Sequence, residues 1–323
     1  MCTALSFKNN DFYFGRTLDL EYHFDEKNVI TPHNYPFKFN YTHDICSHEA
    51  IIGTATVVDG YPLYYDAMNE SGLCVAALSF PDRAKYFDYK ENCLNLASYE
   101  FIPWVLCNFR SVCDLKESLT AVNLTNKYFN DDFPPTSLHW MISDKYSSLT
   151  VESTSDGLKV YENNIGILTN APEFPYHMIN LANYMNLTSN IPENRFSSEL
   201  ILDRYSKGLG SFGLPGDGSS LSRFVRASFM KYNSESGSSE NENISRFFHI
   251  MDSVTQIKGS VKLEDGKSFY TVYTSCCNAD KGIYYYTTYN NRTVTAIEMK
   301  KSNIDSKDLI CVPFIDELEI RYL

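Results

Sequence analysis

The second residue of the chain is a cysteine, and its position allows a self-contained nucleophile. An initiator Met1 is normally removed when the next residue is small, and removal would leave Cys2 with a free α-amine beside its own thiol. Such an amine has a pKa of about 7.7–8.0, so it is partly neutral near pH 7 and can act as a base. Cys2 therefore predicts nucleophilic catalysis at the N-terminus. The alternative is a cysteine on a frayed end.

Two charged residues, Arg16 and Asp19, follow one short turn at residues 9–11. Two strands joined by this turn would bring both residues close to Cys2. The guanidinium of Arg16 would stabilise a thiolate by its charge, and Asp19 would accept a hydrogen bond from the α-amine and orient it. The alternative for these residues is a surface ion pair of little energetic value.

With these residues in place, the chain resembles the choloylglycine hydrolase family. That family comprises bile salt hydrolases and penicillin V acylases within the N-terminal nucleophile hydrolases. Each motif is weak alone, but their order and spacing are specific. The motifs are Met-Cys-Thr at 1–3, Phe-Gly-Arg-Thr-Leu-Asp at 14–19, Asn-Glu-Ser-Gly-Leu at 69–73, Leu-His-Trp at 138–140, Leu-Thr-Asn-Ala-Pro at 168–172, Leu-Pro-Gly-Asp at 214–217 and Ser-Arg-Phe-Val-Arg at 222–226.

The resemblance implies a role for each matching residue. Cys2 corresponds to the nucleophile, and Arg16 and Asp19 correspond to the residues that tune and orient it. Asn170 matches the asparagine whose side-chain amide helps to form the oxyanion hole. Arg223 matches the arginine that completes the charged site.

Ser79 is where the chain departs from the family. The second oxyanion donor of the family is a backbone N–H, which falls at Ser79 here. Bile salt hydrolases usually carry Asn at this position, and penicillin V acylases often carry Tyr. Because a backbone N–H survives any side chain, we expect the oxyanion hole to remain and the choice of substrate to be affected. Losing one such donor typically costs about 2.7–4 kcal/mol.

Together these roles describe the hydrolysis of an amide. The thiolate attacks the carbonyl carbon and forms a thioester, the α-amine passes the proton to the leaving amine, and water releases the acid. No metal or other cofactor is required. The resemblance implies that the substrates are glycine- or taurine-conjugated bile acids. The alternatives are a penicillin V acylase or other N-acyl amide hydrolase on the same machinery, and a non-catalytic binding protein that retains Met1.

The resemblance also implies a substrate pocket lined by Leu20, Phe24, Tyr65 and Phe133, although each of these residues is equally typical of a core. A pocket for a steroid should be mostly apolar. The net charge of −12 gives no long-range attraction for an anionic tail, so recognition of that tail must be local. The two arginines named above are the candidates, because a guanidinium can pair bidentately with a carboxylate or sulfonate.

The elements that must position these residues are rich in strands. Aromatic residues make up 15% of the 323 residues, which favours β-structure. Apolar runs predict strands at 51–58, 73–80, 138–143, 149–153, 158–161, 165–168, 270–275, 283–289 and 294–299, and helical spacing predicts helices at 99–110, 112–122, 174–185, 222–232 and 244–257.

Strands and helices come in groups instead of alternating, which indicates an α+β fold with antiparallel sheets. The resemblance implies a four-layer αββα sandwich, with two antiparallel sheets between helix layers, in a single domain over residues 1–323. It also implies a homo-oligomer, since the family is commonly tetrameric.

Composition excludes several other classes of protein. Lys and Arg number 28 against 40 Asp and Glu, which argues against a nucleic-acid partner. No apolar run reaches the roughly 18 residues of a membrane span, and no signal-peptide pattern begins the chain, so we expect a cytoplasmic protein without a membrane partner. Nine cysteines, an odd number, argue against a disulfide framework.

Four further segments carry weaker expectations. The Gly-rich run at 208–216 lacks the ending of a phosphate loop and is expected to form a wall of the substrate site. The adjacent Cys276 and Cys277 would face opposite sides of a strand, with one buried and one exposed. The polar stretch 233–243 predicts an exposed loop. The tyrosines at 284–286 predict a strand edge or a subunit contact.

Overall fold

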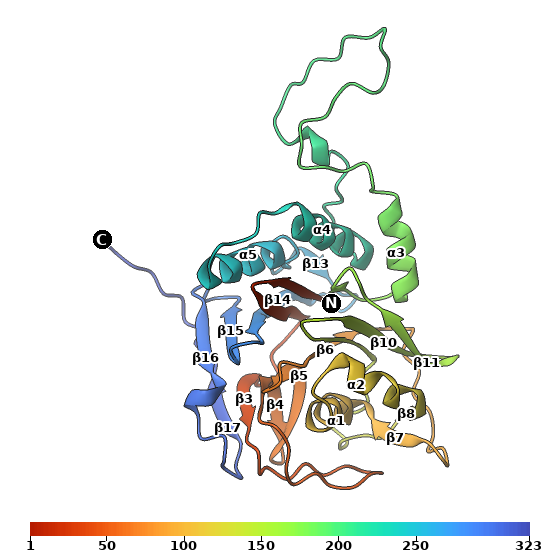
Figure 1. Ribbon diagram of the computed structural model, residues 1–323, viewed down its shortest axis with the longest axis vertical. Helices are drawn as coiled ribbons and strands as arrows, with labels where there is room; N and C mark the ends of the chain where they lie inside the picture. The colour runs from red at the N-terminus through yellow and green to blue at the C-terminus, as the bar shows by residue number, and fades with distance from the viewer.

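Two antiparallel sheets lie face to face in the middle of the computed structural model, which describes residues 1–323 (Figure 1). The first sheet contains both the N-terminal hairpin and most of the C-terminal strands. Its strands, in spatial order, are β12 (Ile167–Leu168), β1 (Cys2–Asn9), β2 (Asp11–Leu20), β14 (Ser268–Asn278), β15 (Ile283–Thr288) and β16 (Thr295–Glu298), with β13 (Val261–Lys262) paired to β14.

The second sheet is built mainly from the first half of the chain. Its strands, in spatial order, are β11 (Gly157–Glu162), β10 (Ser148–Thr154), β9 (Leu138–Ser143), β6 (Cys74–Ser79), β5 (Tyr61–Asn69), β4 (Ile51–Val58), β3 (Lys27–Thr31) and β17 (Ile310–Pro313). A separate parallel pair joins β7 (Leu94–Ala97) to β8 (Val122–Thr125).

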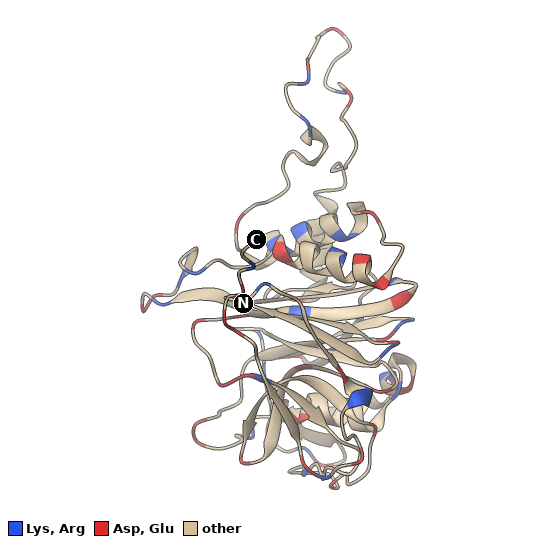
Figure 2. Ribbon diagram, turned by 90° about the vertical axis from the view of Figure 1, so that its left-hand side faces the viewer, with Lys and Arg blue, Asp and Glu red and all other residues tan.

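Helices cover the outer face of each sheet and complete the four layers (Figures 1 and 2). The long helices α4 (Ser220–Asn233) and α5 (Glu240–Asp252) pack on the first sheet, beside α3 (Phe174–Ala182). The helix α1 (Phe101–Asn108) packs on the second sheet, and α2 (Val112–Lys116) lies next to it. The predicted α+β sandwich is confirmed. None of the helices has the length and hydropathy that a membrane span requires.

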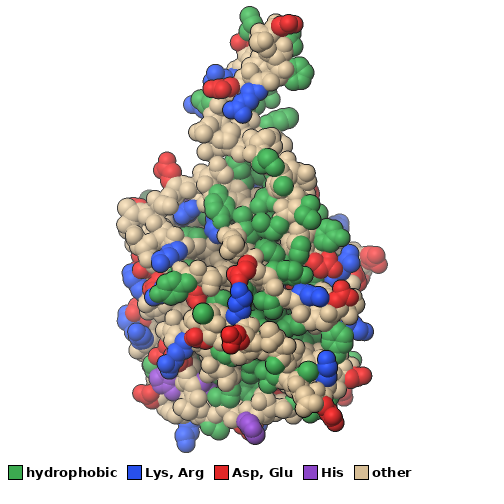
Figure 3. Space-filling model, turned by 45° about the vertical axis from the view of Figure 1, so that its right-hand side comes forward, with side chains coloured by type: hydrophobic (Ala, Val, Ile, Leu, Met, Phe, Trp, Pro, Cys, Tyr) green, Lys and Arg blue, Asp and Glu red, His purple; other side chains and the backbone are tan.

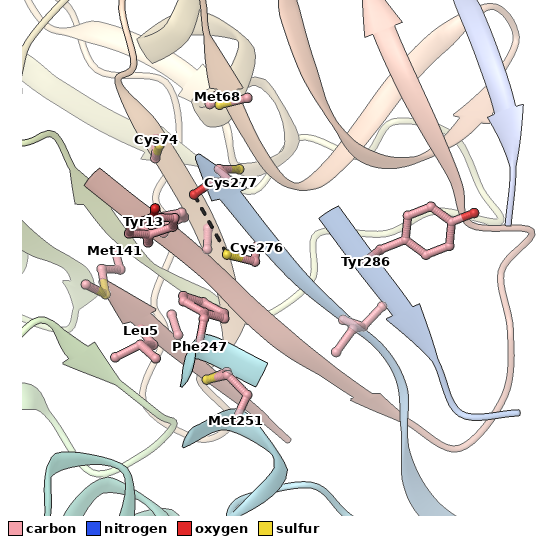
Figure 4. Close-up of a cluster of buried hydrophobic side chains, with 14 of the residues drawn as sticks. Leu5, Tyr13, Met68, Cys74, Met141, Phe247, Met251, Cys276, Cys277 and Tyr286 are labelled. Atoms are coloured by element: carbon pink, nitrogen blue, oxygen red, sulfur yellow. Dashed lines mark hydrogen bonds between the residues drawn. The ribbon is translucent and has the colours of Figure 1, made fainter. Parts of the chain in front are cut away.

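Apolar side chains fill the space between the two sheets. In this cluster, Cys74 of the second sheet lies near Cys276 and Cys277 of β14 (Figure 4). The exposed fractions of Cys276 and Cys277 are 0% and 1%, so the expectation that one of them is exposed is wrong. The reason is that the first sheet is covered on both faces, by the second sheet and by α5.

Three other sequence expectations need correction. The helix predicted at 112–122 is broken, because α2 ends at Lys116 and the chain enters β8 at Val122. The loop predicted at 233–243 ends early, because the side chain of Ser239 accepts a hydrogen bond from the Glu242 N–H and starts α5. The tyrosines at 284–286 lie in β15, which pairs with strands on both sides and is not an edge.

A long arm, residues 187–216, leaves the body between α3 and α4 and projects far from it (Figures 1 and 2). Its base is closed by a hydrogen bond of 3.0 Å from the Thr188 N–H to the Gly210 carbonyl. The arm carries exposed apolar side chains at Phe196, Ile201 and Tyr205. The Gly-rich run belongs to this arm.

The close approach of β2 to β14 gives a first test. A Cβ built on Gly15 would lie 2.0 Å from the carbonyl oxygen of Ser275, so only glycine fits there. We expect Gly15→Ala to lower the free energy of unfolding by about 3 kcal/mol, as overpacking does. Urea unfolding followed by circular dichroism measures the loss.

Gly216→Ala is the matched control, because nothing lies within 4 Å of a Cβ at Gly216. Its effect should stay within about 0.5 kcal/mol. Equal losses in the two variants would contradict the close approach.

Candidate active site

The hairpin of β1 and β2 brings the three N-terminal candidates together. Asn10 turns the chain with a φ of 59°, and the register then places Cys2 opposite Leu18. Met1 is present and extends the pairing: its α-ammonium donates to the Asp19 carbonyl at 2.9 Å, and the Asp19 N–H donates to the Met1 carbonyl at 3.0 Å. Cys2 and Asp19 therefore lie on neighbouring strands, as expected.

The guanidinium of Arg16 lies directly against the thiol of Cys2. Its Nη2 donates to Cys2 Sγ at 2.6 Å. The other donors bind backbone carbonyls: Nη1 binds those of Ala77 and Tyr65, and Nε binds that of Thr17 at 3.1 Å. Every nitrogen of this buried group is thus engaged, and one of them points at the sulfur.

Arg16 stays charged although no part of it reaches solvent. Burial alone would lower the pKa of the guanidinium, but the nearby Cys2, Tyr273, Asp66 and Asp19 raise it above its usual value. This fixed positive charge lies 2.6 Å from Cys2 Sγ, where it can stabilise negative charge that develops on the sulfur during a reaction.

Asp19 has one oxygen to spare. Its Oδ1 accepts a hydrogen bond of 2.7 Å from the hydroxyl of Thr271, whereas its buried Oδ2 has no hydrogen-bond partner. Burying an unpaired carboxylate oxygen is costly. A free α-amine on Cys2 would supply a donor for this oxygen once Met1 is removed, which fits the orienting role expected for Asp19.

Asn170 connects the start of the chain to β6. Its Oδ1 accepts the N–H of Cys2 at 3.0 Å and a donor of Arg223, and its Nδ2 donates to the carbonyl of Ser79 at 2.7 Å. An amide group has two N–H bonds, so one of them has no partner within the protein. The side chain is therefore fixed in place and keeps one donor free.

The N–H of Ser79 points toward the same space. The next N–H, that of Phe80, donates to the Ser137 carbonyl at 2.8 Å. In an antiparallel ladder the N–H and C=O of successive residues point to alternate sides, so those of Ser79 face away from β9. The Ser79 carbonyl meets Asn170 on that side, and the β5 ladder has already ended at Ala76. The expected pair of oxyanion donors is thus geometrically available.

Arg223 of α4 binds several groups of the site on the side away from the cavity. Its Nη1 donates to the Cys2 carbonyl and to the hydroxyl of Thr3, its Nη2 donates to Asn170 Oδ1, and its Nε donates to the Gly218 carbonyl at 3.0 Å. The residue is fully buried. It connects the nucleophile to the asparagine and does not face the cavity.

One sequence expectation fails at this point. Arg16 and Arg223 were the candidates for binding an anionic tail of the substrate, but both guanidinium groups are buried and bonded to groups of the protein itself. Neither offers a free pair of donors to a carboxylate or sulfonate.

A cavity of about 390 Å³ opens from Cys2 and Arg16. Leu20, Phe24, Tyr65 and Phe133 all line it, as does Ser79. The sequence analysis missed several further lining residues, namely Tyr22, Leu63, Tyr64, Tyr99, Ile102, Phe129, Pro134 and Trp140.

Some of the missed lining residues had a visible signal. Phe129 and Pro134 are sequence neighbours of Phe133, whereas Tyr99 and Ile102 come from a helix that reads as ordinary core. The Gly-rich run in the arm contributes nothing to the lining, so its expected role as a wall of this site is wrong.

Two buried histidines hold the segment that carries Asn170. His139 Nε2 donates to the Thr169 carbonyl at 3.0 Å, and His177 Nε2 donates to the Asn170 carbonyl at 2.8 Å. The other nitrogen of His139 lies 3.1 Å from Glu152. Burial lowers the pKa of His177 to about 4, so this ring is neutral at pH 7. The sequence marked His139 only as the middle residue of the Leu-His-Trp motif, without a role, and it did not mark His177 at all.

Residues 2–312 match the sequence model of the linear amide C–N hydrolases, choloylglycine hydrolase family. The chain belongs to this family. It is 45% identical to a bile salt hydrolase/transferase of Lactiplantibacillus plantarum, over 99% of this chain and 98% of that protein. It is 38% identical to a bile salt hydrolase/transferase of Clostridium perfringens, over 100% of both.

Solved structures show the same fold. The C2A mutant of the conjugated bile acid hydrolase from Clostridium perfringens matches with a TM-score of 0.92 at 37% identity, over 100% of both chains. A penicillin V acylase from Agrobacterium tumefaciens matches with a TM-score of 0.76 at 19% identity, over 97% of this chain and 91% of that one, which shows the fold alone. The fold of the N-terminal nucleophile hydrolases, expected from the resemblance, is confirmed.

The pKa of His177 gives a second test. An unfolded histidine titrates near pH 6.5, and the folded one near 4. Between these values the unfolded chain binds more protons, so stability is lost as the pH falls from about 6.5 to 4, by up to about 3 kcal/mol. His177→Gln keeps a donor for the Asn170 carbonyl but does not titrate. We expect this variant to lose that much less stability between pH 7 and 4, as measured by urea unfolding.

His43→Gln is the control, because His43 is exposed. It should follow the wild-type pH dependence. If His177→Gln also followed the wild type, the buried neutral histidine would be refuted.

Proposed function

We propose that the protein hydrolyses the amide bond of glycine- or taurine-conjugated bile acids through a thioester on Cys2. The observation that carries the proposal is the thiol of Cys2, which lies 2.6 Å from Arg16 Nη2 at one end of a largely apolar cavity. Asn170 binds the backbone N–H of Cys2 and the carbonyl of Ser79, and Ser79 lines the same cavity as Cys2. The relatives named as bile salt hydrolases, which match almost the whole chain, support the choice of substrate.

The first half of the reaction uses the N-terminal cluster. Once Met1 is removed, the α-amine of Cys2 keeps Asn170 Oδ1 as a partner and gains the unpaired Oδ2 of Asp19. The amine takes the thiol proton while Arg16 stabilises the sulfur as a thiolate. The thiolate attacks the amide carbon, and negative charge develops on the carbonyl oxygen. The free N–H of the Asn170 amide and the Ser79 N–H stabilise that charge.

The second half regenerates the enzyme. The protonated α-amine gives its proton to the leaving glycine or taurine nitrogen, and the C–N bond breaks to leave a thioester on Cys2. Water, deprotonated by the same amine, then attacks the thioester and releases the bile acid. Arg223 keeps the carbonyl of Cys2 and the side chain of Asn170 fixed throughout.

The composition of the cavity supports selectivity for the acyl part of the substrate. Its lining is mostly apolar, and 15 of its 22 residues are hydrophobic. Because the guanidinium groups of Arg16 and Arg223 are bonded to groups of the protein, neither is free to bind the anionic tail of the substrate. We therefore propose stronger discrimination between a steroid and a phenoxyacetyl group than between glycine and taurine.

A comparison of substrates tests the proposed function. With protein whose mass shows that Met1 has been removed, kcat/KM for glycocholate and taurocholate should exceed that for penicillin V by about tenfold or more, which is 1.4 kcal/mol of transition-state binding. Cys2→Ala should abolish turnover and keep the circular dichroism spectrum, because only the nucleophile is lost.

Cys46→Ala is the matched control, since Cys46 is an exposed free thiol. It should retain full activity. If penicillin V were the better substrate, the proposed substrate would be wrong while the nucleophile stands. Turnover by Cys2→Ala would overturn the mechanism itself.

We also propose a single domain, a homo-oligomer and a cytoplasmic location. The core shared by both sheets supports one domain. The exposed free thiols of Cys46, Cys113 and Cys311 suit a reducing compartment. The arm supports an oligomer, because several large apolar side chains are exposed on this one projecting segment, as at surfaces that bind another protein.

The arm has a matching surface at its base. A groove of about 400 Å³ between α3 and α4 is lined by Met178, Leu181, Met185, Val225 and Phe229, among others. Hydrophobic side chains gather on the surface below the arm (Figure 3). We propose that the arm of one copy packs on this surface of a second copy, in a closed assembly such as the tetramer expected from the resemblance.

Light scattering tests the assembly. The wild type should have a mass of at least twice the 37.0 kDa of one chain. The double substitution Phe196→Glu and Ile201→Glu places charges on exposed apolar positions of the arm and should give a monomer. Glu199→Lys changes the charge of the arm without removing apolar surface and should leave the assembly intact. A monomeric wild type would refute the proposal.

A further inference from the structure

Two buried charged residues near Cys2 form hydrogen bonds between the two sheets. Each comes from one sheet and binds groups of the other. Arg16, from β2 of the first sheet, donates to the carbonyls of Tyr65 and Ala77 in the second sheet. Asp66, from β5 of the second sheet, accepts hydrogen bonds from hydroxyl groups of the first sheet. Both side chains are fully buried. The site described above uses Arg16 and leaves Asp66 without a role.

The carboxyl group of Asp66 is built into a shell of hydroxyl donors. Tyr273 donates to its Oδ1, and Ser275 and Tyr284 donate to its Oδ2 at 2.9 Å and 2.7 Å. The hydroxyl of Tyr284 also lies 2.7 Å from that of Thr54. A carboxylate without solvent or an ion-pair partner in contact needs such donors to remain charged. The three hydroxyl groups therefore stabilise the ionised carboxylate of Asp66.

Asp66 is connected to Arg16 through two short paths. The hydroxyl of Ser275 accepts the backbone N–H of Arg16 at 3.2 Å and donates to Asp66. The carbonyl of Tyr65, which accepts from Arg16 Nη1 at 3.3 Å, belongs to the residue next to Asp66. The backbone of Arg16 and one partner of its guanidinium are therefore both held by groups that Asp66 fixes.

Charge balance gives Asp66 a second effect. Around Cys2 the fully buried groups are two arginines, Arg16 and Arg223, and two aspartates, Asp19 and Asp66. Burial raises the pKa of Asp66 above its usual value, and the opposing effects of Arg16 and the three hydroxyl donors limit that rise. With both aspartates ionised the four charges cancel. Without Asp66 the cluster would carry a positive charge that holds the sulfur as a thiolate more strongly.

The other titratable groups that face Asp66 do not compete in this balance. Burial raises the pKa values of Tyr273 and Tyr284 well above their usual range, so both remain neutral donors. Burial likewise raises the pKa of Cys277, which therefore stays a neutral thiol. Arg16 and Asp66 are the charged pair in this part of the core.

We propose that Asp66 is a positioning residue for the hydrolysis: it aims Arg16 at the sulfur of Cys2 and offsets its charge, and so sets the pH range in which Cys2 reacts. A strongly stabilised thiolate is a weaker nucleophile, so the offset favours attack. The effect on turnover rests on the proposed function, whereas the effect on the reactivity of Cys2 does not.

Asp66→Asn tests the proposal, because it removes the charge and keeps the shape. The readout is the rate at which iodoacetamide alkylates Cys2, followed by peptide mass spectrometry from pH 4 to 10. We expect the midpoint of this profile to move to lower pH by about one unit. For hydrolysis we expect kcat to fall about tenfold or more with little change in KM, since no substrate contact is lost.

Asp144→Asn is the matched control. Asp144 is also a buried carboxylate, bonded to the N–H groups of Val112, Tyr146 and Ser147, but it follows β9 at the end remote from Ser79. It should lower stability and leave the alkylation midpoint unchanged. A merely structural role for Asp66 would give this same pattern in Asp66→Asn, and that result would overturn the proposal.

A second variant keeps the test decisive if Asp66→Asn does not fold. Tyr273→Phe removes one donor, weakens the anionic form of Asp66, and should move the midpoint in the same direction by a smaller amount. An unchanged midpoint would overturn the proposal. Alkylation requires no substrate. A wild-type protein that is alkylated at Cys2 but hydrolyses no conjugate would refute the proposed function, and the alkylation midpoints of the variants would still decide this inference.

Discussion

The contact between Arg16 and the sulfur of Cys2 is the interaction on which the rest of the site depends. Moving an isolated guanidinium out of water costs several kcal/mol, so the fold must surround it with acceptors. Backbone carbonyls from β2, β5 and β6 do this, and they come from both sheets. The two sheets must therefore meet face to face at this point for the nucleophile to have its charged partner.

The same constraint explains why the site is assembled from distant parts of the chain. Cys2 comes from β1, Ser79 from the end of β6, Asn170 from the loop after β12, and Arg223 from α4. Each of these groups is bonded to at least one of the others or to the backbone beside it. Most of their donors and acceptors are therefore occupied by the protein, and the groups left free are those that the reaction needs.

The sequence identified the parts of the fold in which local pattern and burial agree. The strands predicted at 51–58 and 138–143 coincide with β4 and β9, because most residues of each run are apolar and most are buried. The short strands β3, β7 and β17 were missed, since a run of four or five residues carries no period of its own. The prediction that one of Cys276 and Cys277 is exposed failed, because a sheet that is covered on both faces has no alternation of buried and exposed side chains.

The site shows a similar division between local and long-range information. The motif residues could be found because chemistry restricts which residue types occur at these positions, and the structure places Cys2, Arg16 and Asn170 together. The orientation of a side chain depends on partners remote in sequence, such as the Ser79 carbonyl for Asn170. For this reason the sequence predicted that Arg16 and Arg223 bind the substrate, whereas in the structure their N–H groups bind other groups of the protein. Once the positive charges serve the nucleophile, the cavity is left apolar, and recognition must come from the shape of the acyl group that fills it.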